Sequence, residues 1–111
     1  MSAMLDLTVE AEARDRALAA LAGTTVRRPT LCLLKGRVGN EANDRWGWAI
    51  YPRKAIWRFR IASLLSGHRL LFNLGGLSIA IPQFQFLHEL PGNKLAVREG
   101  RLVLLPRSGR A

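Results

Sequence analysis

The most regular alternation of apolar and other residues lies between Trp46 and Ile61, a stretch that holds all three tryptophans and the only tyrosine. The alternation stops at residues 52–55 and then resumes. Period-two patterns rich in aromatic and branched residues are typical of half-buried strands. The pattern therefore predicts a β-hairpin whose short loop is Pro52-Arg53-Lys54-Ala55. In this hairpin we expect core-facing Trp57, Phe59 and Ile61, and solvent-facing Arg58 and Arg60.

A helical pattern precedes the hairpin. From Thr8 to Ala22 the sequence is rich in alanine, leucine, arginine and glutamate, which favour helices. Thr8 is the expected N-cap, and Gly23 is a suitable stop. A narrow apolar face recurs at steps of four along this stretch. The residues of that face are Val9, Ala13, Ala17 and Leu21.

Short apolar runs predict the remaining strands. Residues 30–34 read as a buried strand, residues 68–74 and 77–81 as a pair joined by Gly75-Gly76, and residues 94–98 and 101–105 as a last hairpin. Residues 83–89 fit either a strand or one helical turn. Residues 35–44 are expected to form a mobile loop, and residues 106–111 a basic, flexible tail.

These elements predict one domain over residues 1–111, of the α+β class. We expect one N-terminal helix packed on a mixed, mostly antiparallel sheet of about six or seven strands.

The charge balance points to anionic partners. Seventeen lysines and arginines face eight acidic residues, which gives a net charge of +9. Such a balance favours nucleic acid, acidic proteins or an anionic membrane surface. The arginines are spread along the chain, however, and nucleic-acid binding is more often served by a stripe on one face. An excess of arginine that serves only solubility explains the composition comparably well.

The sequence also indicates a location. No apolar run approaches the ~20 residues that would span a bilayer, and the first residues lack the pattern of a secretory signal. The single cysteine, Cys32, cannot form an internal disulfide, which suits a reducing compartment. We therefore expect a cytoplasmic protein that does not insert into membranes.

Two stretches resemble a known family. LDLTVEAEARDRALAAL is similar to the opening of HesB-like A-type iron–sulfur carriers, and LLFNLGGLSIAIPQFQFLHELPGNKLAVREGRLVL is similar to their second half. In the second stretch Leu87, Leu90 and Gly92 occupy the family's turn positions. The resemblance covers about two thirds of the chain and rests on pattern. It implies a HesB-like fold.

The family's chemistry does not carry over with the pattern. Its carriers hold iron or a cluster through three cysteines, one in a Gly-rich loop and two in the C-terminal tail. Here residues 35–39 read KGRVG and residues 106–111 read PRSGRA, and neither contains cysteine. The resemblance thus implies a non-enzymatic binding or adaptor protein related to iron–sulfur cluster biogenesis but without its ligands. We expect a protein partner or a homo-oligomer.

Other chemistry is weakly represented. Cys32, His68 and His88 are too widely separated to suggest a metal site, and no pair of acids suggests acid–base catalysis. Cys32 is expected in the core. A Cys–His pair would need a closeness in space that the sequence does not show. Neither glycine cluster has phosphate-loop spacing. We expect no catalytic residues, no metal and no cofactor.

The predicted hairpin carries the candidate binding residues. Aromatic side chains beside arginine on a sheet are a common means of holding single-stranded nucleic acid. The alternative function is therefore a small basic nucleic-acid-binding module. Against it stands the simpler reading, in which the tryptophans are core anchors and the arginines a solvated face. The candidate residues are Arg53, Lys54, Arg58, Arg60, Trp46 and Trp48.

Overall fold

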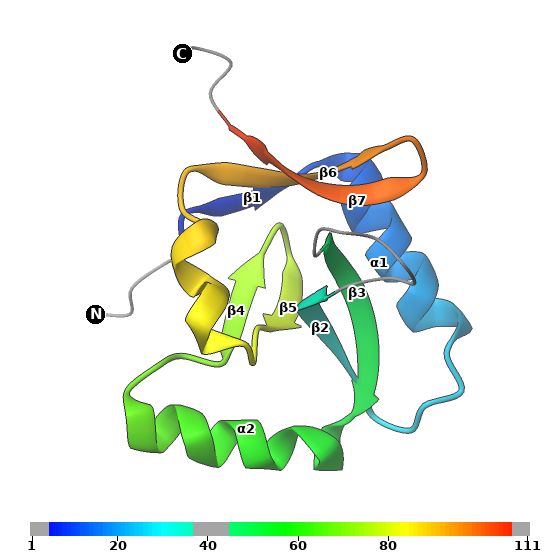
Figure 1. Ribbon diagram of the computed structural model, residues 1–111. Helices are drawn as coiled ribbons and strands as arrows, with labels where there is room; N and C mark the ends of the chain where they lie inside the picture. The colour runs from blue at the N-terminus through cyan, green and yellow to red at the C-terminus, as the bar shows by residue number, and fades with distance from the viewer. Residues whose placement is uncertain (1–4, 37–44, 108–111) are drawn as a thin grey trace.

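A computed structural model describes residues 5–36 and 45–107 (Figure 1). The fold is α+β, as the order of elements predicted. In chain order the elements are β1 (Leu7–Val9), α1 (Ala11–Gly23), β2 (Pro29–Gly36), β3 (Arg45–Pro52), α2 (Arg53–Ser66), β4 (Leu71–Leu74), β5 (Leu77–Ala80), η1 (Phe84–Glu89), β6 (Asn93–Arg98) and β7 (Arg101–Pro106).

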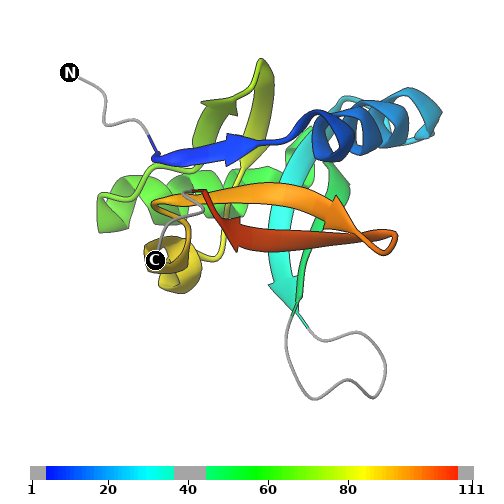
Figure 2. The same cartoon turned by 90° about the horizontal axis from the view of Figure 1, so that it is seen from above.

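The strands form two sheets, so the prediction of a single sheet is wrong. One sheet has the order β1-β6-β7, and the other has the order β3-β2-β5-β4. Each sheet mixes parallel and antiparallel pairs: β1 with β6 and β2 with β5 are parallel. Seen from above, β2 runs across the direction of β6 and β7 (Figure 2). Seven strands are described, which agrees with the predicted six or seven.

The main core lies between the two sheets. The inner face of the four-stranded sheet contributes large side chains such as Leu31, Leu33 and Ile79, and the three-stranded sheet contributes Leu95. Cys32 lies between Leu31 and Leu33 on the opposite face of β2, and all three are buried. Because both faces of β2 are covered, its sequence reads as a continuous apolar run instead of an alternating one.

Helix α1 closes one side of this core. Ala13 and Ala17 are fully buried and Leu21 packs at the edge of the cluster, so these three residues of the predicted apolar face are confirmed. Val9 also packs against the cluster, but from β1 and not from the helix. The helix ends at Gly23 as expected but begins at Ala11, three residues later than predicted. Thr8 lies in β1, where pairing with Lys94 of β6 takes the place of a helix cap.

Helix α2 overturns the central prediction. The first half of the predicted hairpin is the strand β3, but residues 53–66 are helical. The residues expected in the core are exposed: Trp57 by 53%, Phe59 by 41% and Ile61 by 46%. The expected hairpin loop is instead the end of β3 and the first turn of α2. The chain therefore has a second long helix, which lies along one edge of the molecule (Figure 1).

The remaining expectations have mixed outcomes. The pairs β4–β5 and β6–β7 are formed, with turns at Gly75-Gly76 and Glu99-Gly100. The ambiguous stretch at residues 83–89 is mostly the short 3-10 helix η1. Residues 37–44 of the expected loop and 108–111 of the expected tail lie outside the described residues.

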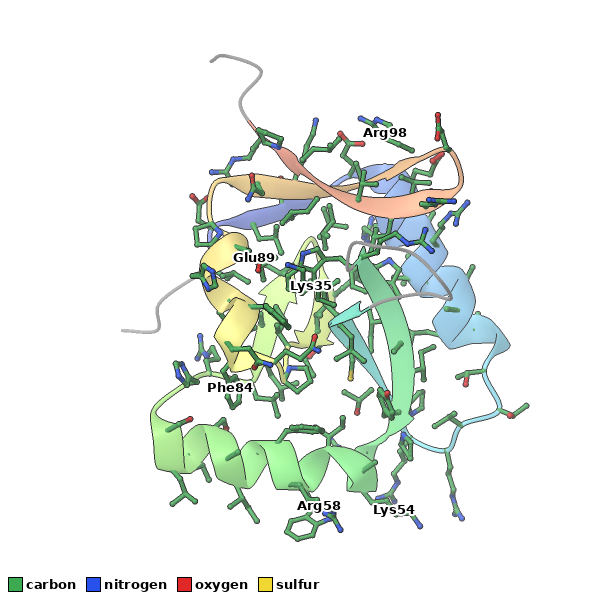
Figure 3. The ribbon with its side chains drawn as sticks, in the orientation of Figure 1. Lys35, Lys54, Arg58, Phe84, Glu89 and Arg98 are labelled. Atoms are coloured by element: carbon green, nitrogen blue, oxygen red, sulfur yellow. The ribbon has the colours of Figure 1, made fainter. Side chains whose placement is uncertain are left out.

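The connection before η1 is tied to β2. The Gln83 side chain accepts a hydrogen bond from the Lys35 backbone N–H at 2.6 Å and donates one to the Lys35 carbonyl at 2.9 Å. Lys35 Nζ also lies 2.6 Å from Glu89 Oε1 of η1 (Figure 3). These contacts fix the segment that runs beside the four-stranded sheet.

Candidate functional site: the surface of helix α2

Helix α2 has clear local signals at its two ends. Pro52 directly precedes it with φ −64°, and Gly67 follows it in the left-handed region at φ 77°. Proline near a helix start and glycine just after its end are the usual punctuation of a helix. Leucine and alanine near the C-terminal end of the stretch add helix propensity. These signals outweigh the period-two alternation of its first half.

Few side chains hold α2 to the rest of the protein. Ile56 and Ser63 are its buried residues. Ile56 packs against Cys32 and Ala80 on the outer face of the four-stranded sheet. Cys32 and Ala80 are cross-strand neighbours, and Ala49 pairs with Cys32 from the other side. Ile56 is the one large side chain of the helix that packs on this row of small side chains, so the contact between α2 and the sheet is small.

The side of α2 that faces away from the sheets is also apolar. Trp57, Ile61, Leu64 and Leu65 follow the i, i+4, i+7, i+8 spacing of one helix face. Leu64 is 82% exposed and Leu65 is 85% exposed. We call these four residues the outward stripe. A helix that has buried one face normally turns a polar face to water, so the outward stripe is unpartnered apolar surface.

Cationic side chains border the outward stripe on both sides. Successive residues on a helix are turned by about 100°, which places Arg58 on one flank and Arg53 and Arg60 on the other. Lys54 is in line with the outward stripe, at its N-terminal end. Lys54 and Arg58 point away from the sheets (Figure 3). The Arg58 guanidinium lies 6.0 Å from the centre of the Trp57 ring, within the range of a cation–π contact. The helix contains no acidic residue.

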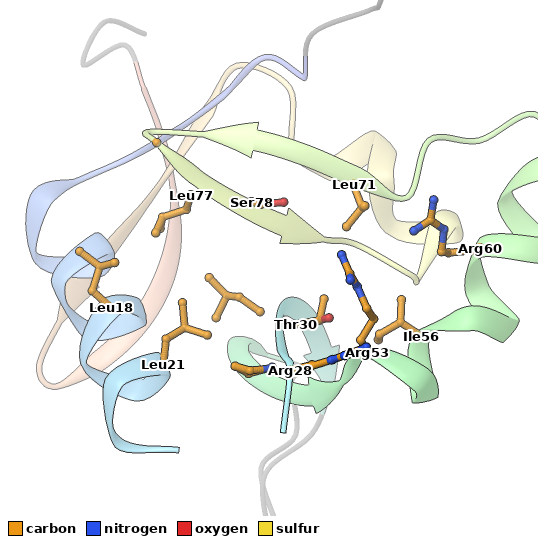
Figure 4. Close-up of a pocket in the computed structure, with 13 residues that line it drawn as sticks. Leu18, Leu21, Arg28, Thr30, Arg53, Ile56, Arg60, Leu71, Leu77 and Ser78 are labelled. Atoms are coloured by element: carbon orange, nitrogen blue, oxygen red, sulfur yellow. The ribbon is translucent and has the colours of Figure 1, made fainter. Parts of the chain in front are cut away.

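A groove runs along the second flank, between α1 and α2. It has a volume of about 580 Å³. Leu18 and Leu21 of α1 stand on one side, and Ile56 and Leu71 on the other (Figure 4). Its polar lining comes from three arginines and two hydroxyls, and none of the lining residues is acidic. These polar residues are Arg28, Arg53, Arg60, Thr30 and Ser78.

Within residues 5–36 and 45–107, no acidic side chain neutralises the cations at this end of α2. Among the described residues, the side chains of Arg28, Arg53, Lys54 and Arg60 form no ion pair or hydrogen bond. A second hollow beside the groove is also basic, and Arg27 is among its lining residues. The basic residues predicted from the sequence thus gather on one surface, although on a helix and not on a hairpin.

The predicted tryptophans are not part of that surface. Trp46 is buried, and its ring meets Phe86 edge-on with 6.3 Å between ring centres. Trp48 is half-buried, and its indole N–H donates a hydrogen bond to the Ala13 carbonyl at 3.2 Å. Both side chains face the main core, so they are not available to stack on a ligand bound at α2. The exposed aromatic residues beside the basic side chains are Trp57 and Phe59.

No metal centre is present in the described part of the chain. It contains no cluster of three or more histidine, cysteine, aspartate or glutamate side chains. His68 stacks on Phe84, with 5.0 Å between ring centres. Cys32 is fully buried, as predicted, and burial raises the pKa of its thiol to about 11. A thiol with that pKa is protonated at neutral pH, which makes it a poor nucleophile and a poor ligand.

Several residues of this surface were not predicted from the sequence. Arg28, Leu64 and Leu65 were not among the candidate binding residues. Their signal was present: the spacing of Trp57, Ile61, Leu64 and Leu65 is helical. Once Ile56 and Ser63 are placed on the buried face, that spacing identifies a second apolar face.

Comparisons with protein-family models, with curated proteins and with solved structures found no match. The resemblance to HesB-like carriers therefore stays a prediction. Within residues 5–36 and 45–107, no helix is both long and apolar enough to cross a membrane.

Proposed function

We propose that this chain is a non-enzymatic binding module that docks on an anionic lipid surface through helix α2. The observation that carries the proposal is the outward stripe with its cationic borders. Leu64 and Leu65 stand more than four-fifths exposed at the edge of the molecule. Helices that lie in a membrane interface combine large apolar side chains on one face with lysine and arginine beside them.

The arrangement of charge favours a lipid surface over other occupants. Cations on both flanks of an apolar stripe contact headgroups on both sides while the stripe enters the acyl boundary. A second copy of this chain would also carry a net charge of +9, so pairing would bring like charges together. An acidic protein could also cover the outward stripe, but the two adjacent, exposed leucines suit the apolar boundary of a lipid layer better.

Binding to vesicles tests this proposal directly. The protein is sedimented with vesicles of phosphatidylcholine alone, and with vesicles that also contain phosphatidylglycerol. We expect binding to the anionic vesicles, weakened by salt because headgroup charges are screened. The tryptophan emission should shift to the blue on binding, and Trp57→Phe should remove most of this shift. Trp46 and Trp48 already lie in the protein interior.

Two variants separate the apolar and the cationic contributions. Leu64→Ser with Leu65→Ser should abolish vesicle binding, and Lys54→Gln with Arg58→Gln should weaken it and reduce its salt dependence. Tyr51→Ser is the matched apolar control, because Tyr51 is 42% exposed but lies on β3. Arg14→Gln is the charge control on α1. Equal losses in the controls, or vesicle binding that survives the double serine variant, would contradict the proposal.

Two other occupants are outcomes of the same experiment. If the protein alone is a dimer and the double serine variant is a monomer, a second copy covers the stripe. If the protein binds an oligonucleotide through Arg53 and Arg58 and ignores anionic vesicles, the nucleic-acid module is the better proposal. That module retains its basic residues but has Trp57 in place of Trp46 and Trp48.

A further inference from the structure

We propose that the groove between α1 and α2 binds a phosphate monoester joined to an apolar chain. This inference concerns a site on the flank of α2 and uses residues outside the outward stripe. The volume of about 580 Å³ lies within the usual range of small-molecule sites, roughly 300–1,000 Å³. Leucines and isoleucine line much of it, and the polar groups of the lining are few. That combination suits a ligand with an apolar body and one charged end.

The charged end must be an anion with high charge density. Among the described residues that line the groove, the ionisable ones are Arg28, Arg53 and Arg60. Arginine presents a planar set of donors that matches the oxygens of phosphate. Three guanidinium groups carry three positive charges, which a phosphate monoester dianion balances more closely than a single carboxylate does. Thr30 and Ser78 add hydroxyl donors at the same site (Figure 4).

The lack of acidic residues among those lining the groove also disfavours ligands that contain an ammonium group. A headgroup that contains an ammonium, such as zwitterionic phosphatidylcholine or anionic phosphatidylserine, needs a carboxylate or an aromatic face for that ammonium. In the part of the chain that the structure describes, no acidic or aromatic residue lines the groove. We therefore expect preference for a terminal phosphate over headgroups that combine phosphate with an ammonium, even when the net charge of the surface is matched.

Arg28 is held in place by its backbone. Its φ of 51° lies in the left-handed region, which is sterically unfavourable for a residue with a Cβ. Its carbonyl accepts a 2.9 Å hydrogen bond from the backbone N–H of Arg53, the first residue of α2. The turn between α1 and β2 is thus joined to the start of α2. This bond places two of the three groove arginines side by side.

The positive φ of Arg28 allows a variant that removes its side chain without disturbing the backbone. Glycine adopts a φ of 51° without steric cost, so Arg28→Gly removes the guanidinium and keeps the fold. Arg28→Lys keeps the charge but lacks the paired donors. Arg27→Gln is the matched control, because Arg27 is adjacent and exposed and does not line the groove.

The ligand has two sources, a lipid in a bilayer or a free phosphate amphiphile, and the experiment has an arm for each. In solution, dihexanoyl phosphatidic acid below its micelle concentration and inorganic phosphate are titrated by calorimetry. On membranes, vesicles with phosphatidic acid are compared with phosphatidylserine vesicles of equal surface charge. Losing a charge-assisted hydrogen bond to phosphate should reduce affinity about tenfold or more.

We expect dihexanoyl phosphatidic acid to bind more tightly than inorganic phosphate, and Arg28→Gly to weaken it while Arg27→Gln does not. Arg28→Lys should fall between them. If inorganic phosphate and dihexanoyl phosphatidic acid bind with equal affinity, the apolar lining does not contribute to binding. If Arg27→Gln and Arg28→Gly lose equal affinity, the ligand is attracted by the general positive charge and not by a defined site. Either result overturns the inference.

The design also distinguishes this inference from the proposed function. Leu64→Ser with Leu65→Ser should lose vesicle binding and retain the soluble phosphatidic acid. Arg28→Gly should bind the soluble phosphatidic acid more weakly but retain most of its binding to phosphatidylglycerol vesicles. Retention of soluble ligand without any vesicle binding would leave the groove intact and refute only membrane docking.

Discussion

The two faces of the four-stranded sheet are covered in different ways. On the inner face, Leu31, Leu33 and Ile79 interdigitate with the three-stranded sheet and with α1. On the outer face, α2 contributes one isoleucine, Ile56, to a smaller cluster. The other members of that cluster are Cys32, Ala80, Leu70, Leu34, Ala49 and Phe84. The inner face uses large side chains to build a stable core. On the outer face, most of the large apolar side chains of α2 point away from the sheet.

The two helices that cover the sheets differ in the same way: α1 serves mainly stability, and α2 offers a surface for binding. Helix α1 buries Ala13 and Ala17 on the core and carries charged residues at positions 12 and 14–16, while Leu18 in its second half is 41% exposed. Helix α2 carries its largest apolar side chains on the side that does not touch the sheet. Apolar surface that contributes little to folding, yet is kept at the edge of a folded domain, is best explained by a partner that covers it.

The largest expected effect is on the inner face. Leu33→Ala removes a fully buried side chain from the main core, and it should lower the free energy of unfolding by about 3–5 kcal/mol. Leu65→Ala removes the same atoms from a side chain that is 85% exposed, and its effect should stay within about 0.5 kcal/mol. Urea denaturation followed by circular dichroism measures both. Similar losses in the two variants would mean that α2 packs more deeply than described.

The second prediction concerns Cys32, which lies under α2. Burial raises the pKa of this thiol from an ordinary value of 9.0 to about 11. Above pH 9 the unfolded chain therefore loses the proton while the folded chain keeps it, so stability falls as pH rises from 9 to 11. The loss should reach about 3 kcal/mol at most.

Comparison of the wild type with Cys32→Ala isolates this loss, because the variant lacks the titrating group. We also expect Cys32 to resist a thiol reagent at pH 8 until the protein is unfolded. Rapid labelling of the native protein would show that the outer face opens readily.

The third prediction tests how firmly α2 is attached. Ile56→Ala removes the one large side chain that the helix inserts into the outer face. We expect a loss of about 2 kcal/mol, at the low end for such a change because the helix can settle onto the small residues beneath it. Amide hydrogen exchange should show faster exchange in α2 and little change in β2. Uniform acceleration across both elements would mean that the two faces unfold as one unit.

The contrast between the faces also explains what the sequence could predict. The continuous apolar run of β2 and the apolar face of α1 were read correctly because tertiary packing supports the local pattern there. Trp57, Phe59 and Ile61 share one parity, which is a strand signal, but Trp57, Ile61, Leu64 and Leu65 share one helical face. The choice between these readings depends on which side chains are buried, and the most apolar ones are not. A reading that equates apolar with buried fails at such a surface.

The candidate site was predicted in part for the same reason. Arg53, Lys54, Arg58 and Arg60 were identified from charge, which does not depend on the type of element. Trp46 and Trp48 were assigned to the same surface only through the supposed hairpin. Arg28 reaches the groove through a turn and a backbone hydrogen bond that no local pattern encodes.

The smallest expected effect concerns Glu10, far from α2 at the start of α1. Its carboxylate lies 2.6 Å from Lys94 Nζ and 3.2 Å from Arg98 Nη1, and its backbone N–H bonds the Leu95 carbonyl. The hydrogen bond from Lys94, and then that from Arg98, hold the pKa of Glu10 below its ordinary value of 4.5. Since the folded pKa is lowered, the stabilisation is present above pH 4.5 and is lost as pH falls through the folded value.

Because these groups are open to solvent, salt should screen the contribution. Glu10→Gln should therefore have only a slight effect on the midpoint of thermal unfolding at neutral pH, and less at high salt. An NMR titration of the carboxyl carbon measures the pKa itself. A value at or above 4.5 would show that β6 does not hold the start of α1 through this carboxylate, leaving the Leu95 hydrogen bond and the buried Ala13 and Ala17 to hold that helix on the core.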